Sequence, residues 1–159
     1  MSQRVDERVK TKENLDAYTK VLELTKYSME ACKPKTKKNS DGTTRESNHH
    51  IPARYSALGT RVIDTLLDMG GKILEANELY INKSLDIAER KKNLVKRLEY
   101  EKDVISITYY IEHIVRVLND HRKFADSTFT YWVKLIVESR RVLIAWRDSD
   151  KKALRGCEL

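Results

Sequence analysis

The chain has few glycines, prolines and cysteines, and it has no long apolar run. Five glycines and two prolines in 159 residues are few for a strand-rich fold, which needs many turns. The two cysteines, Cys32 on an apolar helix face and Cys157 on a polar tail, do not form a disulfide framework. There is no apolar run of about 18 residues, the length that crosses a membrane, and no signal peptide at the start. We therefore expect a cytoplasmic, helical protein outside the membrane.

Motifs of common enzymes and metal sites are also missing. The sequence has neither the GxxxxGK[ST] phosphate loop nor the GxGxxG dinucleotide motif. His49, His50, His113 and His121 match no zinc spacing. Glu112 adjoins a histidine instead of preceding it by three positions, as a di-iron bundle requires. We expect no catalytic residue, no metal and no cofactor, and we expect Cys32 to be buried and unreactive.

Helical periodicity is what the sequence does have. A first helix is expected from near Asp6 or Asn14 to about Cys32, and a second from near Pro52 to Ala76. Each has apolar residues three and four positions apart, which is the pattern of a helix packed lengthwise against others. The first set is Leu15, Tyr18, Leu22, Thr25, Met29 and Cys32, and the second is Tyr55, Leu58, Val62, Leu66, Met69, Ile73 and Ala76.

The second half of the chain carries two more stripes. The third helix is expected from about Ser84 to Asn119, with a solvent-rich first half in which charges of both signs alternate. Its second half carries Val104, Ile107, Ile111, Ile114 and Leu118. The fourth lies in Phe124–Lys152, where one face holds Trp132, Leu135, Ile136, Ser139, Leu143 and Trp146.

Four amphipathic helices with mostly short connections predict an all-α fold, an antiparallel up-down-up-down four-helix bundle. We expect one domain over residues 1–159, with a mobile basic loop at about 33–51 and a disordered tail at about 153–159. The fourth helix also has Val133, Val137 and Ile144 outside its main stripe. Such surplus apolar surface indicates a subunit interface, and hence a homo-oligomer.

The chain is basic, with a net charge of +7 and a pI of about 9.3. A surplus of this size favours polyanionic partners such as RNA. The same charges also fit a solvated face without a partner, and both interpretations stay open. If binding is real, we expect it to be electrostatic and weakened by salt. The candidate contacts are Arg140, Arg141, Arg147, Lys151, Lys152, Arg54, Arg61, Lys35, Lys37 and Lys38.

Three segments, in this order, resemble the accessory variability determinant (Avd) proteins of diversity-generating retroelements. The Ile51-Pro52 step and the stripe that follows it are similar to the start of the family's second helix. Val104 to Leu118, which includes two tyrosines, matches its aromatic-rich helix. The run VKLIVESRRVLIAW resembles its most recognisable segment. The likeness covers roughly Leu15 to Lys152, although the loop at Lys33–Asn48 and the charged start of the third helix look longer than usual.

The resemblance implies a function. Avd proteins are four-helix bundles that assemble as positively charged pentamers, bind the reverse transcriptase of their element, and help it copy template RNA into cDNA. Arg141 and Trp146 correspond best to the family's motif. Two alternatives remain. One is a bundle protein of the kind encoded by intervening sequences in 23S ribosomal RNA genes, and the other is a structural helical oligomer that does not bind nucleic acid.

Overall fold

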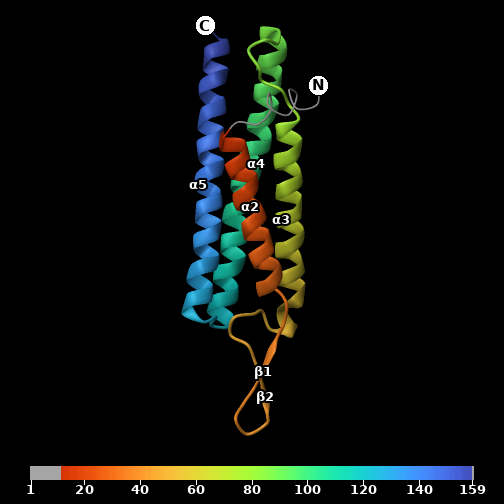
Figure 1. The fold of residues 1–159 in the computed structure, drawn as a ribbon, viewed down its shortest axis with the longest axis vertical. Helices are drawn as coiled ribbons and strands as arrows, with labels where there is room; N and C mark the ends of the chain where they lie inside the picture. Colours follow the sequence, from red (N-terminus) through yellow and green to blue (C-terminus); the bar gives the residue numbers. More distant parts are fainter. Residues whose placement is uncertain (1–11, 159) are drawn as a thin grey trace.

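The computed structural model describes residues 12–158, which fold into four helices packed together and one small hairpin (Figure 1). The expected helix start near Asp6 lies outside the described residues. In chain order the elements are helix α2 (Lys12–Ala31), strands β1 (Thr36–Lys38) and β2 (Thr44–Glu46), a 3-10 turn (Ala53–Tyr55), and helices α3 (Ser56–Asn77), α4 (Ile87–His121) and α5 (Asp126–Cys157).

The helices run alternately down and up, as the sequence predicts, and each packs against two neighbours (Figure 1). The α2–α3 pair and the α4–α5 pair therefore form opposite sides of the bundle, with α2 also against α5 and α3 against α4. No helix in residues 12–158 combines the length and the hydropathy that a membrane-crossing segment requires.

The apolar stripes of α3 and α5 are buried as predicted. Val62, Leu66, Met69, Ile73 and Ala76 of α3 are fully buried. On α5 the whole predicted face is buried, from Trp132 at 0% exposed to Trp146 at 1%. Burial of large side chains such as these gives about 1.5–3 kcal/mol each, so these two faces supply much of the core.

The stripe predicted for α2 is only partly correct, because Thr25 and Cys32 are buried, whereas Leu22 and Met29 remain 39% and 43% exposed. The rest of the buried face runs through positions 17, 21, 24, 28 and 31, most of which hold small residues. Ser28 explains the shift, because its hydroxyl accepts a hydrogen bond from Trp132 Nε1 at 2.9 Å. Small side chains on α2 leave room for Trp132. The size of the apolar residues on α2 therefore did not predict which of its faces is buried. The side chain of Leu15 lies outside the described part.

The segment expected to be a mobile loop instead contains an antiparallel hairpin, which lies beyond one end of the bundle (Figure 1). Its turn is closed by Asp41 Oδ1, which accepts the Thr43 N–H at 3.0 Å, and by Gly42, whose φ of 88° suits glycine. Ile51, fully buried, fixes the other end of the segment by donating its N–H to the Ala31 carbonyl at 2.8 Å.

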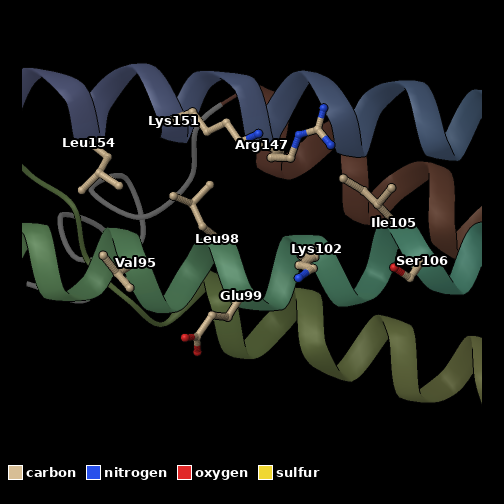
Figure 2. A pocket seen from close by; sticks show the side chains of 9 residues that line it. All are labelled: Val95, Leu98, Glu99, Lys102, Ile105, Ser106, Arg147, Lys151 and Leu154. Carbon is tan, nitrogen blue, oxygen red and sulfur yellow. The ribbon is translucent and has the colours of Figure 1, made fainter.

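The disordered tail predicted at about 153–159 is also corrected. Helix α5 continues to Cys157, so residues 153–157 are helical. Leu154 explains the extension, because its side chain is half-buried on the α4 side of this last part of the helix and gives it an apolar contact (Figure 2).

Candidate functional site

The ten predicted contact residues lie at three levels of the bundle. Lys35, Lys37, Lys38 and Arg54 lie at the hairpin end (Figure 1), Arg61 lies in the second turn of α3, and Arg140 and Arg141 lie near the middle of α5. Arg147, Lys151 and Lys152 lie in the last third of α5, at the opposite end. Eleven residues of helix separate positions 140 and 151, which is roughly 17 Å at 1.5 Å per residue. The residues therefore form three basic regions and not one patch.

At mid-height, Arg140 is held within the bundle. Its Nε donates to Thr108 Oγ1 at 2.9 Å, its Nη2 donates to Glu112 Oε1 at 2.7 Å, and its Cζ lies 3.7 Å from the centroid of the Tyr109 ring. Burial raises the pKa of Glu112, but hydrogen bonds from Arg140 and Arg116 outweigh it and lower that pKa. The Arg140 charge is thus matched inside the protein, and it joins α4 to α5.

Arg61 and Arg141, in contrast, are exposed. Arg61 Nη1 donates to the hydroxyl of Tyr110 at 3.5 Å, which is a long contact. Arg141 makes no ion pair in the described part of the chain. Tyr109 and Tyr110 are 55% and 41% exposed, so two tyrosine rings lie at the surface in the same region. Arginine beside tyrosine suits contacts with phosphates or with a protein surface.

At the far end, a groove of about 530 Å³ lies between α4 and α5 (Figure 2). Leu98 from α4 and Leu154 from α5 point into the space between the helices. The cationic side chains of Lys102, Arg147 and Lys151 line the groove, with Glu99 as the one acid. Arg147 also contacts Asp148, its neighbour, at 3.3 Å. The groove combines apolar surface with positive charge.

A charged cluster is buried between the same two helices, in the part of α4 that was expected to face solvent. Arg97 is 0% exposed, and its Nε and Nη2 donate to the two carboxylate oxygens of Asp150 at 2.9 and 3.2 Å. Its Nη1 donates to the Leu79 carbonyl at 3.3 Å, and its guanidinium lies 5.6 Å from the Trp146 ring. A bidentate pair of this kind is the geometry in which arginine tolerates burial.

Glu101 is the third ionisable residue in this cluster, and its carboxyl group is protonated at neutral pH. It is 0% exposed, and neither of its carboxylate oxygens meets a donor among the described residues. Burial, together with the Asp150 carboxylate beside it, raises the pKa of Glu101 to about 10. A protonated Glu101 can donate a hydrogen bond to Asp150, which two ionised carboxylates cannot do. The cluster thus holds one arginine, one carboxylate and one neutral carboxylic acid.

A second polar network fixes the base of the hairpin. Ser47 Oγ lies 2.8 Å from His50 Nδ1, and His50 Nε2 lies 3.7 Å from Glu30 Oε1. This has the residue types of a hydrolase triad, but the serine contacts Nδ1 instead of Nε2 and is only 3% exposed. Burial, aided by the Lys35 charge, lowers the pKa of His50. His49 Nδ1 contacts Thr128 Oγ1 of α5, so the network ties the hairpin to the helices.

Two properties bear on whether residues 12–158 hold a reactive arrangement, namely the burial of the Cys32 thiol and the clustering of potential metal ligands. Cys32 is 8% exposed, as expected, and burial raises its pKa to about 12, so it is protonated at neutral pH. Within residues 12–158, histidine, cysteine, aspartate and glutamate side chains do not gather in any group of three that could hold a metal ion.

The sequence analysis missed the buried residues Leu94, Arg97, Glu101 and Thr108. Together with the predicted Val104 they are spaced 3, 4, 3 and 4, so the stripe of α4 continues through charged residues. That spacing was the available signal. Arg45 was missed because the hairpin was read as a loop.

Comparisons of the chain with known protein families, with curated proteins and with solved structures found no match.

Proposed function

We propose that this protein is a non-enzymatic accessory subunit that binds RNA, or the cDNA copied from it, together with a reverse transcriptase. The main support for this proposal is that basic residues at the two ends of the bundle lack ion-pair partners. Within residues 12–158, exposed cations that make no ion pair lie at both ends, among them Lys37 and Arg45 at the hairpin end and Lys151 and Lys152 at the opposite end.

The resemblance to Avd proteins supports a reverse transcriptase as the protein partner, and the positive charge supports a nucleic acid as the second partner. Cations without acidic partners are the groups that neutralise phosphates and release counterions on binding. The predicted Arg147, Lys151 and Lys152 lie on or beside the groove between α4 and α5, whose apolar floor suits a protein partner. In this proposal the groove end contacts the polymerase, and the hairpin end contacts nucleic acid.

Self-association belongs to the proposal as well. A second apolar groove, of about 290 Å³, lies between α2 and α3, on the opposite side of the bundle, and Leu22, Leu67 and Leu74 line it. The residues that line this groove are uncharged, whereas the groove between α4 and α5 has a cationic rim. Two different apolar faces on opposite sides favour head-to-tail contacts, and such contacts form a ring when the rotation between subunits closes. A homopentamer follows from the resemblance alone.

The extra apolar residues of α5 contribute less to such an interface than the sequence indicated. Val133 and Ile144 pack partly against the core of their own chain, and Val137 is half-buried. The exposed leucines of α2 and α3 are therefore the better candidates for the contact.

Co-purification tests the polymerase contact. The chain is expressed with the reverse transcriptase of a diversity-generating retroelement, and the complex is captured at about 50 mM and about 300 mM salt, because electrostatic contacts weaken with ionic strength. We expect a complex that survives at the lower salt and is lost from a Lys151→Glu, Lys152→Glu variant. The absence of any complex at low salt would reject the polymerase contact.

The alternatives make different predictions. A structural oligomer predicts a ring without salt-dependent RNA binding, which a gel-shift assay and sedimentation together would reveal. A bundle protein of the intervening-sequence type predicts association with ribosomal RNA and a gene that lies within a 23S ribosomal RNA gene.

A further inference from the structure

The hairpin places two like charges directly opposite each other. In the register of β1 and β2, Lys37 pairs with Arg45, while Thr36 pairs with Glu46 and Lys38 pairs with Thr44. Side chains opposite one another in an antiparallel pair have their Cβ atoms about 5 Å apart on the same face of the hairpin. Like charges in this position destabilise a hairpin, so the pair costs stability in the free protein.

The surroundings hold these two cations in place and leave them uncompensated. Lys37 and Arg45 line a polar pocket of about 170 Å³ together with Glu46, Ser47 and Asn48. Glu46 does not neutralise them, because its carboxylate is bound by Arg54 at 3.0 Å and lies 3.8 Å from Arg122. Both cations are exposed, and neither makes an ion pair with any residue from 12 to 158.

The pocket is also fixed to the bundle. The Asn48 carbonyl accepts the Ala125 N–H at 2.9 Å at the start of α5, and the Ser47 carbonyl accepts a bond from Arg122 Nη2 at 3.1 Å. Because the base of the hairpin is held by main-chain bonds, less ordering is needed when an anion binds. Preorganisation of this kind raises affinity without a new contact.

We infer that the face of the hairpin formed by Lys37 and Arg45 binds the phosphodiester backbone of RNA. This inference rests on the proposed function and adds to it the place and the type of contact. A phosphate between the two side chains turns their repulsion into two attractions, since arginine can bond two of its oxygens and lysine supplies a point charge. The segment from Thr36 to Glu46 has no aromatic residue to stack on bases. Binding is therefore independent of sequence.

Lys38, which its charge alone made a candidate contact, provides a matched control, because the register of the hairpin excludes it from the face of Lys37 and Arg45. It lies next to Lys37 on the same strand, carries the same charge and is also exposed, but it pairs with Thr44 on the other face of the hairpin. If only net charge matters, substituting either lysine should weaken RNA binding equally. If RNA contacts one face, only the substitution of Lys37 should weaken it.

The experiment measures the affinity of a labelled single-stranded RNA of about 20 nucleotides by anisotropy, between about 50 and 300 mM salt. The proteins are the wild type, Lys37→Gln with Arg45→Gln, and Lys38→Gln with Thr44 unchanged. Loss of two phosphate contacts reduces the slope of log K against log salt by about 1.4, which corresponds to about 25-fold weaker binding near 0.1 M salt. The Lys38→Gln variant keeps the wild-type slope. A DNA strand of the same sequence should show the same difference, because it shares the phosphodiester backbone.

The outcomes separate this inference from the proposed function. If the wild type binds RNA and the double variant binds equally well, the hairpin contact is rejected and the proposed function stands. Equal losses in the double variant and in Lys38→Gln, scaled to the charge removed, would reject the contact on one face. If the wild type does not bind RNA at low salt, both are rejected. Because the hairpin lies outside the bundle, its substitutions should leave the melting temperature of the helices unchanged. Circular dichroism checks that each variant is folded.

Discussion

Replacing Glu101 with glutamine should stabilise the protein, although it removes a charged residue type from the core. Glu101 is 0% exposed, and its pKa is raised from 4.5 to about 10 by burial and by Asp150. At neutral pH the folded protein must therefore hold a proton that the unfolded chain has released. Glutamine keeps the shape and can donate its amide N–H to Asp150 without this proton.

The magnitude follows from the pKa in the unfolded chain. Each pKa unit is worth about 1.4 kcal/mol, and about 2.5 units separate pH 7 from the ordinary value of 4.5. Protonation of Glu101 therefore costs about 3 kcal/mol of folding free energy at pH 7, provided that the folded pKa lies above 7. This is a large part of the 5–15 kcal/mol that is typical of a domain.

The sign of the pH dependence distinguishes this effect from a change in packing. Because the folded pKa is raised, the stability linked to this proton is complete below about pH 4.5 and is lost as the pH rises toward about 10. The free energy of unfolding of the wild type should therefore fall, relative to Glu101→Gln, by about 1.4 kcal/mol per pH unit in this window. The two proteins should be similar near pH 4.5 and differ by about 3 kcal/mol at pH 7.

Urea denaturation at several pH values measures the difference. Glu99→Gln is the control, because Glu99 lies on the same helix but is exposed, and it should change stability little at any pH. Parallel curves for the wild type and Glu101→Gln would refute the reasoning. A less stable Glu101→Gln at pH 7 would do the same, since it would mean that an ionised Glu101 shares the guanidinium of Arg97.

Three further predictions concern the core. Asp150→Asn removes the carboxylate charge that pairs with the buried Arg97 guanidinium and should lower the free energy of unfolding by about 3 kcal/mol, as measured in urea; a loss below about 1 kcal/mol would contradict it. Gly71→Ala should raise stability by up to about 1 kcal/mol, because nothing lies within 4 Å of the added Cβ, whereas Gly59→Ala should lower it, because its Cβ would lie 3.3 Å from that of Cys32; thermal melting would contradict this if the order were reversed. A thiol reagent should label half-exposed Cys157 in the folded protein and buried Cys32 only after denaturation; rapid labelling of two thiols in the native state would count against the packing.

The sequence predicted the bundle because two of its helices follow the rule that large apolar residues face inward. The stripe of α3 from Val62 to Ala76 and the stripe of α5 between its two tryptophans obey that rule at every position. On α2 the rule failed, because Trp132 fills space left by Ser28 and its neighbours, and a single helix does not reveal the bulk of its partner. The 3-and-4 spacing was correct, whereas the chosen face was right at Thr25 and Cys32 and wrong at Leu22 and Met29.

The buried charges and the hairpin were harder to predict, for different reasons. Arg97 is buried because Asp150, 53 positions later in the chain, accepts two of its bonds, and this pairing depends on the register between α4 and α5. The hairpin has strands of three residues and no buried side chain in either strand, so it lacks the alternation that marks a half-buried strand. The candidate cations were mostly identified by charge, but their partners were not, so Arg140 could not be separated from Arg141.

The contact between α2 and α5 has a consequence for synthesis of the protein. These two helices are the first and the last of the described elements, and the hydrogen bond from Trp132 to Ser28 joins residues 104 positions apart. While the chain emerges from the ribosome, the apolar faces of α2, α3 and α4 stay exposed to solvent. They are covered only when α5, with its two tryptophans, has been synthesised. During that interval the nascent chain offers apolar surface to chaperones or to other nascent chains. Slower translation of the last helix should therefore lower the yield of soluble protein.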